Sequence, residues 1–73
     1  MAMNLRYAEV GREYIVKSIC TDDEELNAFL FSLGLYSGEP VTVVSRRRGS
    51  RTIAIKDGRY NVDEALAEAI VVE

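Results

Sequence analysis

The chain has 73 residues, which is enough for one small domain and leaves no room for a second. Hydrophobic residues make up 48% of it and charged residues 29%, a balance that is ordinary for a globular protein and too apolar for a disordered one. The formal net charge of −3 argues against a general binder of nucleic acid or anionic membranes. With no signal-peptide layout and no apolar run near the ~20 residues of a spanning helix, we expect a cytoplasmic domain over residues 1–73 without membrane insertion.

The first predicted strand covers residues 14–20, which are rich in β-branched side chains. Gly11 precedes it at a position that suits a turn, because glycine adopts backbone conformations that other residues avoid. The opening segment with Leu5 and Ala8 is interpreted as a mostly polar lead-in. The single cysteine, Cys20, has no partner for an internal disulfide and is interpreted as a small buried side chain.

A helix is predicted to begin at Thr21, because Thr21 followed three residues later by Glu24 matches a capping box. Four apolar residues then fall at helical spacing and form one stripe, namely Leu26, Phe29, Leu30 and Leu33. Gly34 stands where a left-handed residue commonly ends a helix, and Leu35 after it can pack back on Leu30. The pattern therefore predicts a helix of about three turns that stops at Gly34.

The rest of the chain is predicted to form short strands joined by tight turns. These are a turn at 36–40, strands at 41–44, 51–56 and 59–62, and a last short strand at 70–72. Asp57-Gly58 is the strongest two-residue hairpin signal, and Asp63 can cap a single helical turn over 64–69. Five short strands, one inserted helix and a one-turn helix before the last strand predict a mainly β fold, a small and partly open SH3-like barrel.

Three segments of the chain together resemble one known family, the ferrous iron transport protein A (FeoA) domain. The central segment, residues 30–43, is similar to the family's hallmark L-x-x-L-G-L-x-x-G-x-x-V-x-V. The flanking likeness is carried by Leu5, Gly11, Val16 and Ile19 before it and by Leu66, Ala67, Ile70 and Val72 after it. The resemblance implies an SH3-like barrel with its helix between the first two strands. The barrel is also similar to the C-terminal domain of metal-dependent repressors, but no helix-turn-helix precedes it here.

By resemblance, the chain is an accessory protein of ferrous iron uptake. Its partner would be the cytoplasmic GTPase domain of the membrane ferrous iron transporter, on which it would dock and whose cycle it would modulate. A homo-oligomer is left open. The alternative is a stand-alone regulatory or RNA-binding SH3-like barrel that uses an arginine-rich hairpin.

The residue types leave little room for chemistry. The chain has no histidine and one cysteine, so it lacks the ligands of a nitrogen and sulfur zinc site and the base of a Cys-His or Ser-His pair. The carboxylates of residues 22–25 are hard-cation ligands, but the first turn of a helix recruits such residues for its dipole, and we prefer that interpretation. We therefore expect no catalytic residue, no cofactor and no metal site.

Two groups of residues are candidates for contact with a partner. The predicted docking residues, where the helix turns back to the barrel, are Leu33, Gly34, Leu35, Tyr36 and Gly38. The predicted basic hairpin tip comprises Arg46, Arg47, Arg48 and Arg51. The hairpin tip suits a solvated loop, a contact with an acidic partner or a phosphate contact, of which nucleic acid is the least favoured. An exposed Tyr36 offers contact area at low entropic cost, while a ring that merely covers the barrel end is an equal alternative.

Overall fold

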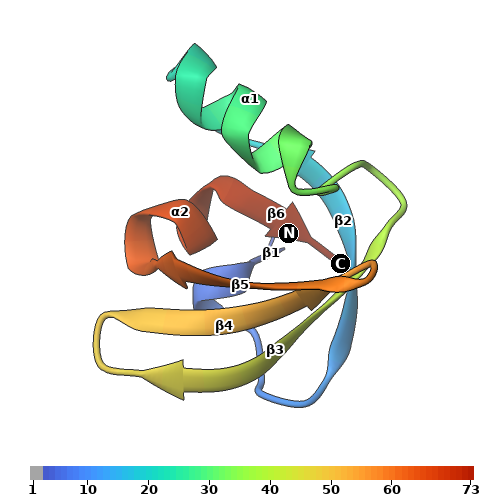
Figure 1. Cartoon of the computed structure of the whole chain (residues 1–73), viewed down its shortest axis with the longest axis vertical. Helices are drawn as coiled ribbons and strands as arrows, with labels where there is room; N and C mark the ends of the chain where they lie inside the picture. Colours follow the sequence, from blue (N-terminus) through green and yellow to red (C-terminus); the bar gives the residue numbers. More distant parts are fainter. Residues whose placement is uncertain (1–2) are drawn as a thin grey trace.

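The computed structural model describes residues 3–73 as a strongly curved antiparallel sheet with two helices (Figure 1). The elements in chain order are β1 (Met3–Asn4), the 3-10 helix η1 (Leu5–Tyr7), β2 (Glu13–Ile19), α1 (Glu24–Ser32), β3 (Pro40–Arg47), β4 (Ser50–Ile55), β5 (Gly58–Asp63), α2 (Glu64–Ala69) and β6 (Ile70–Val72). The strands are hydrogen-bonded in the order β1-β6-β2-β3-β4-β5. The predicted mainly β class, the inserted helix and the short helix before the last strand are confirmed, while residues 1 and 2 lie outside the description.

The core is built from the inward-facing side chains of the strands. Along β4 every second residue is buried, as expected for a strand whose successive side chains point to opposite faces. Val41 and Val43 of β3 lie opposite Ile55 and Ile53 of β4, so the inner face is a set of cross-strand aliphatic pairs. Fully burying each such side chain contributes about 1.5–3 kcal/mol, which makes this face the main source of stability.

The N-terminal segment is part of the barrel, which corrects the interpretation of a polar lead-in. Leu5 and Ala8 are fully buried, and β1 pairs antiparallel with β6 at the edge of the sheet. Residues 3–73 therefore form six strands where five are predicted. The two-residue β1 is too short to show a period-two pattern, and of the three residues in the following 3-10 helix only Leu5 is buried.

A register shift in β2 overturns the buried interpretation of Cys20. Tyr14 and Val16 point inward, and simple alternation would turn Cys20 inward as well. The pairing of β2 with β6 shifts between Val16 and Ser18, so that Ile19 becomes the half-buried residue and Cys20 is exposed. One extra residue in a strand reverses which side chains face the core.

Helix α1 begins at Glu24, later than the predicted start at Thr21. The N-cap is Asp23, whose Oδ1 accepts hydrogen bonds from the backbone amides of Glu25 at 3.0 Å and Leu26 at 3.1 Å. The Thr21 hydroxyl instead accepts from the amide of Asp23 at 3.1 Å and orders the turn before the helix. Aspartate is at least as good a cap as threonine, and here it satisfies two amides at once.

The C-terminal end of α1 confirms the predicted helix stop. Gly34 has φ +100°, its amide donates to the carbonyl of Phe31 at 3.0 Å, and the amide of Leu35 donates to the carbonyl of Leu30 at 3.3 Å. These two bonds define a Schellman motif. The side chain of Lys56 lies over Gly34, with Cδ 3.0 Å from the position that a Cβ would occupy.

Replacing the glycine at this cap should destabilise the fold. We expect Gly34→Val to lower the free energy of unfolding by about 1–3 kcal/mol, because a β-branched residue is strained at positive φ and crowds Lys56. Gly34→Asn is the matched control. It should lower the free energy of unfolding by less than Gly34→Val does, since asparagine tolerates this backbone region better. Thermal or urea melts of both variants measure the difference, and equal melting temperatures for Gly34→Val and the wild type would contradict the assignment.

Both hairpin turns contain two residues, and each differs slightly from its prediction. Arg48 and Gly49 connect β3 to β4, so these strands extend further into the hairpin than the predicted strands at 41–44 and 51–56. The turn between β4 and β5 is Lys56-Asp57, one residue earlier than the predicted Asp57-Gly58. A Cβ on Gly58 would lie 2.6 Å from Cζ of Tyr60, so a larger residue at this position would require the Tyr60 ring to move.

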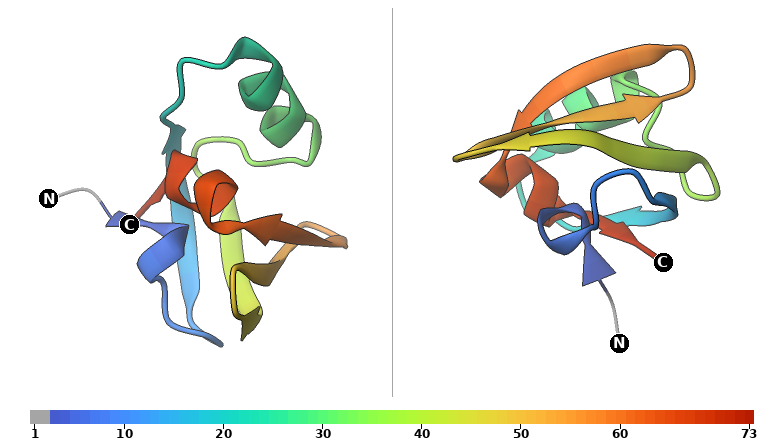
Figure 2. Two further views of the ribbon diagram at one scale, coloured as in Figure 1. Left: turned by 90° about the vertical axis from the view of Figure 1, so that its left-hand side faces the viewer. Right: turned by 90° about the horizontal axis from the view of Figure 1, so that it is seen from below.

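The C-terminal elements follow their predictions. Asp63 caps α2, with its Oδ1 accepting a hydrogen bond from the amide of Leu66 at 2.8 Å. Ala67 and Ala69 are buried on the inner side of this short helix, and β6 then enters the sheet between β1 and β2. Figure 2 shows α2 (red) beside η1 (blue), and these two elements contact each other.

Candidate functional site

Helix α1 extends away from the barrel rather than lying on it (Figures 1 and 2). Of the predicted apolar stripe, Leu30 is fully buried, Leu26 and Leu33 are half-buried, and Phe29 is 51% exposed. The prediction of one stripe was therefore wrong for Phe29, which lies at the edge of the narrow face that contacts the core. Much of the helix surface is left open to solvent.

The predicted docking residues divide between the core and the surface. Leu35 and Gly34 are buried and Leu33 is half-buried, because the Schellman turn folds this segment back onto the barrel. Tyr36 is 36% exposed, and Gly38 is exposed in the following turn. Tyr36 and Gly38 are thus the accessible members of the set, while Leu35 belongs to the core.

Tyr36 belongs to a cluster of aromatic side chains at this end of the molecule. Its ring centroid is 4.5 Å from that of Phe31 with an interplanar angle of 54°, and the Nζ of Lys56 lies 5.1 Å from the Tyr36 centroid. Lys56 also forms an ion pair with Glu39 at 3.3 Å. The exposed fraction of Phe31 is 58%. We call Phe31 and Tyr36 the aromatic face. Phe29 is 51% exposed, but it precedes Phe31 by two residues, roughly 200° around the helix, and therefore lies on a different side of α1.

Sequence reasoning missed the exposure of both phenylalanines of α1. Phe29 is predicted to lie in the buried stripe, and Phe31 is not singled out. A signal was present in the sequence: residues 26–33 contain five large apolar side chains, and a helix face about 100° wide cannot bury all of them. At least one aromatic residue of this helix had to face solvent.

A shallow groove runs along the outer surface of α1. It is lined by Glu24, Asn27, Ala28 and Phe31, which follow the spacing i, i+3, i+4 and i+7 and therefore share one face of the helix. Phe31 belongs both to this groove and to the aromatic face. The small side chain of Ala28 forms the middle of the groove floor.

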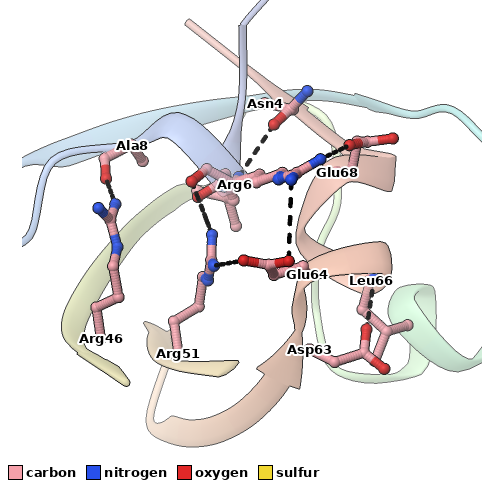
Figure 3. Close-up of polar contacts among 10 residues, drawn as sticks. Asn4, Arg6, Ala8, Arg46, Arg51, Asp63, Glu64, Leu66 and Glu68 are labelled. Atoms are coloured by element: carbon pink, nitrogen blue, oxygen red, sulfur yellow. Dashed lines mark hydrogen bonds and ion pairs between the residues drawn. The ribbon is translucent and has the colours of Figure 1, made fainter. Parts of the chain in front are cut away.

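The four arginines of the predicted hairpin tip do not act as one cluster (Figure 3). Arg51 is 3% exposed: its Nη1 donates to the carbonyl of Arg6 at 2.8 Å and to that of Leu5 at 3.4 Å. The guanidinium of Arg46 donates to the carbonyl of Ala8. Both arginines thus bind backbone carbonyls of the N-terminal segment.

The remaining two arginines, Arg47 and Arg48, are exposed at the end of the hairpin. The end of the β3–β4 hairpin is at the lower left of Figure 1, whereas α1 is at the top. A phosphate site built from several arginines gains affinity from each cation that it presents. Arg51 is buried against the N-terminal segment, whereas Arg46 is exposed and keeps its charge, so the hairpin end presents three of the four arginines.

Charged groups also connect the N-terminal segment to α2. Arg6 bonds to Glu68 through Nη1 at 2.7 Å and lies 3.9 Å from Glu64, which is also 3.8 Å from Nη2 of Arg51 (Figure 3). The hydrogen bond from Arg6 to Glu68 is the main cause that raises the pKa of the Arg6 guanidinium above its ordinary value. The network ties η1, β4 and α2 together at the open side of the barrel.

Two negative findings concern the described residues. Within residues 3–73, no three His, Cys, Asp or Glu side chains are grouped so that they could hold a metal ion. No helix in that range is long and apolar enough to cross a membrane.

The strand order, the helix between β2 and β3, and the short helix before the last strand define a small SH3-like domain. The FeoA of Stenotrophomonas maltophilia, a prokaryotic SH3 domain protein solved with zinc, matches with a TM-score of 0.90 and 21% identity over 99% of this chain and 91% of its own. The sequence profile of the FeoA domain matches residues 3–73, and the chain therefore belongs to the FeoA family, which is associated with ferrous iron transport.

Other solved structures share the fold. An iron uptake regulatory protein (FeoA) matches with a TM-score of 0.87 and 23% identity over 100% of this chain and 97% of its own. A manganese-dependent transcriptional repressor matches with a TM-score of 0.90 and 24% identity over 99% of this chain. The chain corresponds to only 40% of that repressor's length. No curated protein sequence matches this chain.

Proposed function

We propose that this chain is a cytoplasmic, non-enzymatic, single-domain accessory of ferrous iron uptake. It docks on the cytoplasmic GTPase domain of the membrane ferrous iron transporter and modulates that protein's cycle. Membership of the FeoA family supports the pathway. The Stenotrophomonas relative, which is described as a candidate ferrous iron transport activating factor, supports a role exerted on a transporter.

The observation that carries the proposal is the exposure of the aromatic face. Phe31 leaves more than half of its surface in water and packs on the partly exposed ring of Tyr36, although a domain of this size has few aromatic residues to bury. Large apolar side chains that cluster on a surface commonly mark a protein interface, and aromatic residues are enriched among those that dominate binding energy. The barrel holds this face in place through the buried Leu30 and the Schellman turn.

Shortening either aromatic side chain should weaken binding to the transporter. We expect Tyr36→Ala and Phe31→Ala each to cost about 1–3 kcal/mol of binding free energy, roughly a 5- to 150-fold rise in Kd. Both side chains are partly or largely exposed, so thermal melts should remain close to that of the wild type. The measurement is a calorimetric or optical titration with the purified cytoplasmic GTPase domain.

A double variant at the hairpin separates docking from steering. Arg47→Ser with Arg48→Ser should mainly slow association and reduce its salt dependence, because exposed charges outside an interface core act on encounter more than on lifetime. Complete loss of binding in this variant, with normal binding by Tyr36→Ala, would move the docking site to the hairpin. If the wild type binds RNA and not the GTPase domain, the RNA-binding alternative replaces the proposal.

A further inference from the structure

The groove on α1 has a shape that suits the packing of a second helix against it, and we call it the helix-binding groove. Its four lining residues occupy successive turns of one helix face, so the groove runs parallel to the helix axis. Helices pack with their axes about 8–10 Å apart, and the closest approaches need a small residue at the crossing point. Ala28 provides that small residue at the centre, between Glu24 one turn before it and Phe31 about one turn after it.

The charge on this face is one-sided. Helix α1 contains Glu24 and Glu25 in its first turn and no basic residue, and Asp22 and Asp23 precede it. The ion pairs found among residues 3–73 involve other carboxylates, so these four have no cationic partner there. Of these carboxylates only that of Glu24 lines the groove, which therefore has an apolar end at Phe31 and an anionic end at Glu24.

We propose that α1 docks an amphipathic helix of the partner that carries basic residues at one end and an apolar side chain that fits over Ala28. The inference deepens the proposed function and rests on it, because it states the chemistry of the segment that the GTPase domain presents. Apolar contacts with Phe31 and Ala28 supply affinity, and the basic residues fix the direction in which the partner helix lies. Helix α1 has nine residues, which at about 1.5 Å per residue spans two to three turns of a partner helix.

A second copy of this chain complements the face less well. An antiparallel pair of α1 helices would bring the anionic end of each copy near Lys56 of the other, since Lys56 lies beside Tyr36 at the far end of α1. Lys56 is already paired with Glu39, so most of the carboxylates would remain uncompensated. Association would also bring together two molecules that each have a net charge of −3. A basic partner has neither disadvantage.

Two sets of variants test the contributions of charge and shape to binding at the helix-binding groove. The probe is the purified cytoplasmic GTPase domain. Asp22→Asn, Glu24→Gln and Glu25→Gln together remove the charge while keeping the Asp23 cap. The matched control is Glu9→Gln, Glu13→Gln and Glu73→Gln, which removes the same charge from exposed positions outside α1. We expect about a tenfold rise in Kd at low salt for the α1 variant, about twofold or less for the control, and a flatter salt dependence only for the former.

The shape is tested by Ala28→Leu, which fills the groove but preserves helix propensity. We expect at least about a tenfold rise in Kd for Ala28→Leu and little change for Ala28→Ser, with melting temperatures confirming that both variants fold. Absence of wild-type binding to the GTPase domain would overturn the proposed function itself. Normal binding by both Ala28→Leu and the charge variant would overturn only the proposal that the partner binds at the helix-binding groove on α1. If the wild type sediments as a dimer and Ala28→Leu abolishes the dimer, the helix-binding groove is occupied by a second copy of this chain. That result would also overturn the proposal of a partner helix.

Discussion

Arg51→Ala is expected to lower the free energy of unfolding by about 2–4 kcal/mol, because it removes a buried charged donor that holds two backbone carbonyls. The guanidinium links β4 to Leu5 and Arg6 and lies beside Glu64 of α2. Its loss leaves those carbonyls without their donor and opens a cavity under η1. Chemical denaturation followed by circular dichroism measures the loss.

Arg48→Ala is the matched control for this prediction, since it removes the same side chain from the exposed end of the same hairpin. Its effect should stay within about 0.5 kcal/mol, as for most surface substitutions. Arg51→Lys should fall between the two, because an ammonium keeps the charge but cannot reproduce the planar fork that meets two carbonyls. If Arg48→Ala lowered the free energy of unfolding as much as Arg51→Ala, the assignment of Arg51 as buried and Arg48 as exposed would be wrong.

The arginines also show where sequence reasoning reaches its limit. Four arginines within six positions have the same pattern whether they are solvated or buried, and the groups that bury Arg51 come from residues more than forty positions earlier in the chain. No local pattern contains that information. Cys20 illustrates the same limit, because a single bulge in β2 reversed the face predicted by alternation.

Features with a local cause were predicted well. Gly34 and Asp63 were assigned as a helix stop and a helix cap, because those roles depend on backbone geometry within a few residues. The succession of elements along the chain from β2 to β6, with the inserted helix, followed from the same kind of signal repeated along the chain, whereas their order within the sheet was not predicted. Of the two residues of the aromatic face, Tyr36 was found from sequence and Phe31 was not, because its exposure depends on how far α1 stands from the barrel.

The weak attachment of α1 connects its structure to its proposed role. A helix that buried all its apolar residues against the barrel would have no aromatic face to offer. As a consequence, α1 is held to the barrel by few contacts. Its stability depends on them, because a helix of nine residues is not stable alone in water. Leu30 should therefore carry much of the attachment, since it is the fully buried residue of this helix and its carbonyl accepts the amide of Leu35 in the cap.

Leu30→Ala is accordingly expected to destabilise the protein by about 2–4 kcal/mol, through the lost burial and the cavity left behind. Loss of this anchor should release α1 first, so amide hydrogen exchange should accelerate more in residues 24–32 than in β3 and β4. Phe31→Ala is the control, because it removes a larger side chain that is 58% exposed and should cost well under half as much. If Phe31→Ala matched Leu30→Ala in both stability and exchange, the aromatic ring would be part of the core, and the surface on which the docking proposal rests would not exist.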